Sequence, residues 1–185
     1  YITINISSPN TEGLRDFHDQ NKLEELLAAL NQIKKQKKTN ISLLLKVSPD
    51  INVNDISEIA DTAIKNDISA IILTNTTNKN RDNLLSETKK EEGGLSGKPL
   101  QQISTIMIKK FYKELKGKIP IIGVGGVSSG KSAYEKIIAG ASLLQLYTGL
   151  VYKGPLVAKK IKKELIQILK TEGISNIKEA VGKDV

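Results

Sequence analysis

The chain has 185 residues, a formal charge of +8 and no cysteine, so disulfides, cysteine-based zinc sites and a cysteine nucleophile are excluded. A single histidine, His18, excludes a multi-histidine metal site. With 39% hydrophobic and 26% charged residues, and no apolar run near the roughly 20 residues of a membrane span, the composition predicts a soluble globular domain or part of one.

Many of the lysines lie in helical patterns, in runs such as those at residues 34–38 and 159–163. A basic surface can bind nucleic acid, but only two Phe and no Trp are present to stack on bases. Both runs also fall within helical patterns. We therefore interpret them as solvated outer faces and expect no nucleic-acid partner.

The first predicted strand spans residues 1–6, where apolar and β-branched side chains predominate. It ends in a cluster of small polar residues, Ser-Ser-Pro-Asn-Thr, at 7–11. In parallel α/β proteins the C-terminal ends of strands form the functional site; the alternative is an ordinary turn. Because the chain starts within this strand and without a methionine, we expect a fragment of a longer protein.

A helix follows, with Asn21 as its expected N-cap and Glu24 at the N3 position. Its apolar residues recur at helical spacing: Leu23, Leu26, Leu27, Leu30 and Ile33. After the first lysine run, the pattern predicts a strand over 41–47, a helix over 56–64 and a strand over 69–73.

Residues 78–98 are polar and show no periodicity. An irregular segment of about 20 residues is rare in a compact domain and is usually functional. We therefore expect a partly mobile loop that gates the mouth of a site. The elements predicted after it are a helix over 103–115 with Ile106 inward, a strand over 119–124, a helix over 133–138, a strand over 142–147, a helix over 154–169 with Leu156 inward, and a helical tail at 177–181.

Five strands that alternate with helices predict right-handed βαβ units and a parallel sheet. Two α/β folds then compete. A doubly wound sheet is complete at this length, whereas a (β/α)8 TIM barrel needs about 250 residues, so the chain would cover about the last five β/α units. Polar or glycine-rich sequence follows every predicted strand. This favours the barrel, because a doubly wound fold concentrates its site at one switch point.

Two features at the strand ends indicate an anionic ligand. The glycines within 93–97 and 123–126 allow backbone N–H groups to approach a phosphate closely, although they can equally be turn formers. Lys46 lies near the end of a predicted buried strand. An unpaired buried ammonium is costly, so Lys46 is expected to meet an anion; the alternative is a lysine that reaches solvent at the strand edge.

Seven segments together resemble class 2 (quinone-dependent) dihydroorotate dehydrogenases. They occur in the family's order over essentially the whole chain: NISSPNT at 5–11, GLR at 13–15, LLKVSPD at 44–50, TNTT at 74–77, GGLSGKPL at 93–100, IIGVGGV at 121–127 and QLYT at 145–148. The resemblance covers only the later part of the family's chain. It implies that residues 1–185 are a single domain, the C-terminal part of an FMN-binding TIM barrel, without the N-terminal helices and first barrel strands.

The resemblance implies oxidation of dihydroorotate to orotate in de novo pyrimidine (UMP) biosynthesis, with FMN as hydride acceptor and a quinone as final electron acceptor. It also implies a full-length protein peripheral to the inner cell or mitochondrial membrane, through the part that precedes this chain, while the fragment itself is soluble. Two alternatives remain open: another FMN-dependent TIM-barrel oxidoreductase, and a non-catalytic phosphate-binding α/β fragment.

The resemblance also implies roles for individual residues, with no metal. Ser8 matches the catalytic base, and a serine here, where class 1 enzymes have cysteine, places the chain in class 2. The substrate-binding residues are Asn5, Asn10, Asn75 and Thr76. The cofactor-binding residues are Asn5, Lys46, Thr74, Gly97, Gly126, Tyr147 and Thr148. Because a serine hydroxyl is a weak base, Thr11 is a candidate proton-relay partner; its alternative role is that of a turn hydroxyl.

Overall fold

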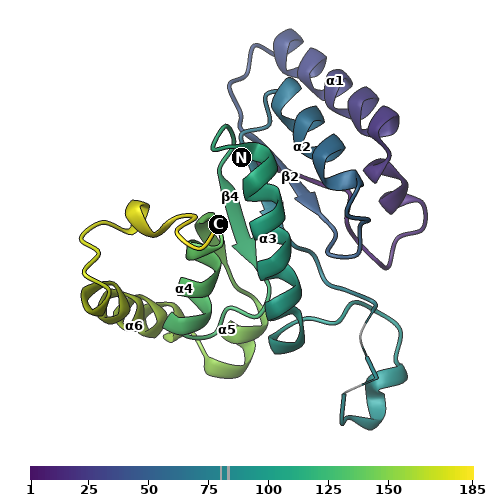
Figure 1. Cartoon of the computed structure of the whole chain (residues 1–185). Helices are drawn as coiled ribbons and strands as arrows, with labels where there is room; N and C mark the ends of the chain where they lie inside the picture. Colours follow the sequence, from purple (N-terminus) through teal and green to yellow (C-terminus); the bar gives the residue numbers. More distant parts are fainter. Residues whose placement is uncertain (80, 83) are drawn as a thin grey trace.

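The computed structural model describes residues 1–79, 81–82 and 84–185 (Figure 1). The strands are β1 (Ile2–Asn5), β2 (Leu43–Val47), β3 (Ala70–Leu73), β4 (Ile121–Val124) and β5 (Ala141–Gln145). The α-helices are α1 (Gln20–Gln36), α2 (Asp55–Lys65), α3 (Gln101–Leu115), α4 (Gly130–Ile138), α5 (Thr148–Lys153) and α6 (Val157–Thr171). Short 3-10 helices are η1 (Leu14–His18), η2 (Glu87–Lys90), η3 (Lys98–Leu100) and η4 (Ile177–Ala180).

The sheet is parallel, and its strands lie in the order of the sequence, β1-β2-β3-β4-β5. Each right-handed connection therefore moves one strand in the same direction and places its helix on the same face. Figure 1 shows α1, α2 and α3 side by side over this face. A doubly wound sheet would reverse its strand order at a switch point. The predicted segment of a (β/α)8 barrel is thus the fold observed.

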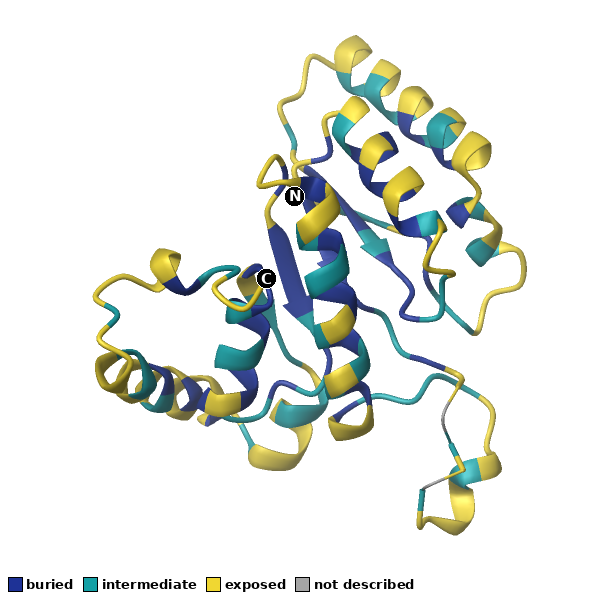
Figure 2. Cartoon of the chain, viewed as in Figure 1, coloured by how far each residue is buried: buried dark blue, intermediate teal, exposed yellow. Residues whose placement is uncertain are grey.

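The two faces of the sheet pack differently. Leu45 on β2 belongs to the main core beneath the helices, together with Phe111 from α3. Leu44 belongs to a small separate cluster on the other face, with Ile72 from β3. Lys46 lies two residues after Leu44 and so shares this second face. In Figure 2 the buried residues follow the strands and the inner sides of the helices.

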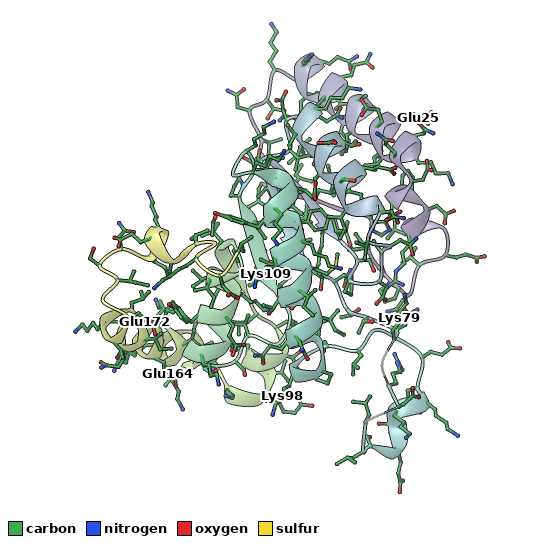
Figure 3. The ribbon with its side chains drawn as sticks, viewed as in Figure 1. Glu25, Lys79, Lys98, Lys109, Glu164 and Glu172 are labelled. Atoms are coloured by element: carbon green, nitrogen blue, oxygen red, sulfur yellow. The ribbon has the colours of Figure 1, made fainter. Side chains whose placement is uncertain are left out.

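Charged residues cover the outer faces of the helices. Glu25 on α1 projects outward in Figure 3. Most lysines of the runs at 34–38 and 159–163 are exposed as well. The prediction that these runs form solvated outer faces is confirmed.

The start of α1 differs from the prediction. Asp19, rather than Asn21, is the N-cap, and its Oδ1 accepts hydrogen bonds from the backbone N–H groups of Asn21 and Lys22, both at 3.1 Å. A carboxylate at this position satisfies two free donors of the first turn and lies at the positive end of the helix dipole. The helix therefore starts earlier than the Asn21-Glu24 pair suggests.

Three expected inward-facing residues are instead exposed: Ile33, Ile106 and Leu156. Leu156 is the residue before α6, which starts at Val157 and not at 154, so it lies off the buried stripe of Val157, Ile161 and Leu165. Helix α5 was not predicted. The fifth strand ends at Gln145 rather than at 147, and the chain turns into α5 directly afterwards.

The segment from 78 to 98 leaves the body of the molecule at Lys79, labelled in Figure 3, and projects away from the sheet (Figure 1). Its two ends are joined by an antiparallel bridge between Thr77 and Leu95. The Arg81 guanidinium donates to the backbone carbonyls of Glu91 and Gly93. The described part of the segment is thus a folded loop; the mobility expected of it stays a prediction.

Across the described residues, none of the helices combines the length and apolar character that crossing a membrane requires.

Candidate active site

The chain leaving β1 and the chain leaving β3 form one polar cluster. Ser7 is fully buried, and its Oγ donates to Asn5 Oδ1 at 2.7 Å. Asn75 Nδ2 donates to Ser7 Oγ at 3.0 Å and to Asn5 Oδ1 at 3.4 Å. Asn75 Oδ1 in turn accepts from the backbone N–H of Thr76 at 2.7 Å. The structure therefore brings together Asn5, Asn75 and Thr76, three of the predicted substrate residues.

Ser8 follows this cluster on a turn. Its Oγ accepts from the backbone N–H of Asn10 at 3.3 Å and from Thr11 Oγ1 at 3.4 Å. Among the described residues, no imidazole or carboxylate hydrogen-bonds to this oxygen. Two donors aimed at Ser8 Oγ stabilise the negative charge that it gains when its proton leaves. Thr11 can therefore assist Ser8. Its backbone carbonyl also accepts from Leu14 N within the same turn. Its two expected roles, proton-relay partner and turn residue, both stay predictions.

A buried carboxylate joins the three loops that follow β1, β2 and β3. Asp50 Oδ2 accepts from Arg15 Nη2 at 3.1 Å, and Asp50 Oδ1 accepts from Thr77 Oγ1 at 2.5 Å. Arg15 Nη1 also donates to Asn78 Oδ1 at 3.1 Å. The Asp50 side chain is only 6% exposed. These bonds hold the loop that contains Ser8 and the loop that contains Asn75 in one arrangement.

The single histidine has a structural position. His18 is buried, its Nδ1 lies 2.8 Å from the Arg15 carbonyl, and its Nε2 accepts from Ser48 N at 3.4 Å. A carbonyl only accepts, so the ring proton must be on Nδ1. Burial lowers the pKa of His18, which favours this neutral form. Both ring nitrogens are occupied by the backbone, and His18 does not contact Ser8.

A cleft of about 480 Å³ opens at the C-terminal ends of β2 to β5. Its walls include every predicted cofactor residue except Asn5: Lys46, Thr74, Gly97, Gly126, Tyr147 and Thr148. Lys46 is half-buried rather than fully buried, and burial lowers its pKa. Asn75 and Thr76 also line the cleft, so its walls continue into the cluster around Ser7.

Glycines shape the part of the cleft at β4 and β5. Gly126 has a φ of 73°, and a Cβ there would lie 2.4 Å from Gln101 Cβ. Gly97 has a φ of 78°, and a Cβ there would lie 2.9 Å from Thr148 Cγ2. Both positions therefore require glycine for conformation and for space. Both glycines line the cleft, where a backbone without side chains suits an anion.

The long loop reaches the predicted substrate residues at its second end. A Cβ on Gly94 would lie 1.8 Å from Thr76 Oγ1 and 3.1 Å from Pro9 Cγ, so Gly94 packs between the loops of β3 and β1. Asn10 is exposed and lines a second, shallow cleft, together with residues 90–93 of the long loop. The predicted position of this loop beside the site is therefore observed.

Sequence reasoning missed Ser7 and Asp50. Ser7 could have been found, because a two-residue period along the first strand places it on the same side as Asn5. Asp50 lies within the segment at 44–50 that carries the resemblance, but the sequence assigns it no role. Its partners Arg15 and Thr77 lie 35 and 27 positions away along the chain, and no local pattern signals such contacts.

Comparison with known proteins identifies related chains. A family model described as dihydroorotate dehydrogenase matches residues 1–169. The mouse protein "Dihydroorotate dehydrogenase (quinone), mitochondrial" is 44% identical over 186 residues, which are 100% of this chain and 47% of that protein. The "Dihydroorotate dehydrogenase (quinone)" of Parvibaculum lavamentivorans is 41% identical, with 100% of this chain and 52% of that protein covered.

A solved structure has the same fold. The crystal structure of DHODH from Eimeria tenella in complex with ferulenol superposes with a TM-score of 0.93 at 37% identity. The match covers 100% of this chain and 54% of that chain. The chain thus spans about half the length of the curated relatives that it matches.

Proposed function

The chain belongs to the dihydroorotate dehydrogenase family, and from this premise we propose that it is the C-terminal part of an FMN-dependent barrel enzyme that oxidises dihydroorotate to orotate. In this proposal residues 1–185 form one domain that is completed by earlier barrel strands. A quinone is the final electron acceptor, as the names of the relatives suggest, and the reaction belongs to de novo pyrimidine biosynthesis.

One observation supports this proposal above all: two different binding surfaces meet at one edge of the sheet. The first is the amide and hydroxyl cluster of Asn5, Ser7 and Asn75. The second is the glycine-lined part of the cleft around Gly97 and Gly126. A pyrimidine ring offers alternating donors and acceptors that suit the first, and a phosphate suits the second.

The residues present fit FMN. The cleft is continuous from Lys46 to Gly126, so one elongated ligand can contact both. Lys46 presents a cation at the end where the flavin ring would lie, and the open glycine backbone suits the phosphate at the other. When bound, FMN supplies the acceptor for the hydride that leaves C6 of dihydroorotate.

The residues of this chain then bind the substrate and move one proton. Asn10, Asn75 and Thr76 hold the pyrimidine ring, and Asn5 contacts both ring and cofactor. Ser8 Oγ removes the proton from C5, which the neighbouring carbonyl of the substrate makes acidic, and the original hydroxyl proton of Ser8 leaves to solvent beside the exposed Thr11. The hydrogen bonds from Asn10 N and Thr11 Oγ1 stabilise the charge on that oxygen.

The alternative of another FMN-dependent barrel oxidoreductase is less well supported, because it gives no reason for Ser8 beside paired asparagines. The second alternative, a non-catalytic phosphate-binding fragment, does not explain the polar cluster around Ser7. We also propose that the complete protein is peripheral to the inner membrane through the part that precedes this chain, as the mitochondrial relative suggests.

The test uses the complete protein that contains this chain. We expect it to purify with a flavin absorption spectrum that bleaches when dihydroorotate is added without oxygen and recovers when a soluble quinone follows. A bound flavin that dihydroorotate does not bleach would indicate another flavin oxidoreductase. A protein that binds no flavin would contradict the proposal altogether.

A further inference from the structure

A lysine with no assigned role is buried beneath the glycine part of the cleft. Lys136 on α4 has 0% exposure. Its Nζ donates to three groups in the first turns of α3: Ser104 Oγ at 2.5 Å, Thr105 Oγ1 at 3.1 Å and the Gln101 carbonyl at 3.2 Å. These bonds join α4 to the start of α3.

The partners of Lys136 are all uncharged. None of the ion pairs among the described residues includes it. The adjacent carboxylate, Glu135, instead accepts from Gln101 Nε2 at 2.7 Å. A buried ammonium that hydrogen-bonds to no carboxylate is costly. Lys136 lies at the N-terminal end of α3, which is also the positive end of that helix, and Glu135 offsets part of this positive charge without bonding to Lys136.

The turn at Gly125 and Gly126 packs directly on the polar groups that bond to Lys136. Ser104 Oγ, which accepts from Lys136, lies 3.2 Å from the carbonyl of Gly125. A Cβ on Gly126 would lie 2.7 Å from Gln101 Cα, so the turn contacts the backbone of α3 at its first residue. Gly125 and Gly126 line the cleft, whereas Lys136 does not. One layer of chain therefore separates the ammonium from the ligand.

We propose that Lys136 is a positioning residue for the phosphate group of FMN, an inference that rests on the proposed function. It acts in two ways. Its hydrogen bonds hold the first turn of α3 against Gly125 and Gly126, and its positive charge stabilises the phosphate dianion bound on the other side of that turn. The phosphate adds the anion that Lys136 lacks among its own hydrogen-bond partners.

Comparison of FMN with riboflavin tests this proposal, because the two flavins differ only in the phosphate. In the flavin-free complete protein, Lys136→Met should weaken FMN binding about 10-fold, a factor typical of one buried charge near an anion, and change riboflavin binding less than about 2-fold. Lys131→Met, an exposed lysine on the same helix, is the matched control and should change neither. Equal losses for both flavins would mean that Lys136 only supports the fold.

The wild-type protein provides a second measurement if Lys136→Met does not fold. Burial lowers the pKa of Lys136 to about 8, Glu135 opposes this shift, and α3 presents only uncharged partners. Between pH 7 and 9.5 the preference for FMN over riboflavin should therefore fall. Lys46 titrates at the ring end, so it affects both flavins equally and cancels in the ratio. A constant ratio would overturn the inference, and a protein that binds neither flavin would instead overturn the proposed function.

Discussion

The C-terminal edge of the sheet has two halves that are built from different parts of the chain. At the ends of β1 and β3 the site consists of side chains: Ser7 bonds to Asn5 and Asn75. At the ends of β4 and β5 it consists of backbone, because Gly97 and Gly126 leave no room for a side chain. The side-chain half should be sensitive to changes of chemical group and the glycine half to changes of shape.

Different interactions hold the two halves of this edge in place. The side-chain half is held by an ion pair between loops, Arg15 with Asp50, at the edge of the barrel. The glycine half is held by a buried lysine without a carboxylate partner, Lys136. If the halves are independent, substitutions in one should change substrate binding or chemistry, and substitutions in the other should change cofactor binding. Substitutions in each half therefore test this separation.

The largest effect is expected at Ser8, the proposed base. In the complete protein, Ser8→Ala should slow flavin reduction by dihydroorotate by roughly 10²–10⁴-fold, the usual range for loss of a general base. Orotate and FMN binding should change little, because Asn10, Asn75 and Gly126 remain. Reoxidation by quinone should be unaffected, since that half-reaction needs no base at C5. Stopped-flow absorbance of the flavin measures the two half-reactions separately.

The neighbouring serine is the matched control for this experiment. Ser7→Ala removes the hydroxyl that joins Asn5 to Asn75, so it should weaken orotate binding more than Ser8→Ala does and slow reduction less. Ser8→Cys should recover part of the rate at raised pH, because a thiol ionises near pH 8.5. Normal reduction by the Ser8→Ala enzyme would remove Ser8 from the mechanism.

The next largest effect is expected from a shape change in the glycine half. Gly126→Ala places a Cβ 2.4 Å from Gln101 Cβ at a φ of 73°. We expect a loss of about 3 kcal/mol in the free energy of unfolding, from left-handed strain and the forced shift of α3. FMN binding should weaken with it. Urea denaturation and flavin titration measure the two effects.

Gly117→Ala separates strain from crowding. Gly117 has a φ of 75°, and a Cβ there meets nothing within 4 Å. Its loss should be only about 1 kcal/mol, with FMN binding unchanged. Similar losses for the two variants would show that the space around Gly126 has no special importance.

The parts of the molecule that the sequence predicts are those with local signals. Alternation of apolar strands with helical periodicity predicts the barrel segment, and polar residues after each strand predict the edge where the cleft lies. Lys46 was singled out from its place in a predicted buried strand and Thr74 through the resemblance, and both line the cleft. The catalytic and binding roles of these residues stay predictions, because position alone does not test a role.

The parts that the sequence does not predict depend on contacts between distant segments. Helix α5 has only six residues, and its apolar side chains Leu150, Val151 and Tyr152 are exposed, so no periodic pattern marks it. Lys136 follows Glu135 in a helix and has the sequence context of a surface lysine. Its burial results from α3 packing on α4, and its partners lie more than 30 positions away.

The third prediction concerns the pH dependence of stability caused by Lys136. Its pKa in the fold is about 8, below the ordinary value of 10.5. The unfolded chain therefore binds more protons than the fold between these values, and stability must rise with pH in this window. Relative to Lys136→Met, the flavin-free protein should gain about 1.6 kcal/mol between pH 8 and 9.5, because the folded lysine is still half protonated at pH 8. Urea denaturation across this range provides the measurement.

Bound FMN sharpens this experiment. If the phosphate stabilises the charged lysine, the gain between pH 8 and 9.5 should be smaller in the FMN-loaded protein than in the flavin-free one. Riboflavin should not reduce it. If the Lys136→Met variant keeps the full pH dependence of stability, other lysines cause the effect.

The smallest effect is expected at the ion pair of the side-chain half. Asp50→Asn keeps one acceptor oxygen but removes the charge that faces Arg15. It also turns an amide donor toward Arg15 or Thr77, both of which already donate to this position. Because Arg15 is partly exposed, we expect a loss of about 1.5 kcal/mol in the free energy of unfolding, less than for a fully buried pair. Asp184→Asn is the matched control: it breaks the exposed pair of Asp184 with Lys109 and should cost less than about 0.5 kcal/mol. Asp50→Asn also removes a contact that the loops of β1 and β3 share. Orotate binding should therefore weaken about 3-fold, a factor worth about 0.7 kcal/mol, while FMN binding stays the same. A parallel loss of FMN binding would mean that the edge of the sheet behaves as one unit, and the division into two halves would then be wrong.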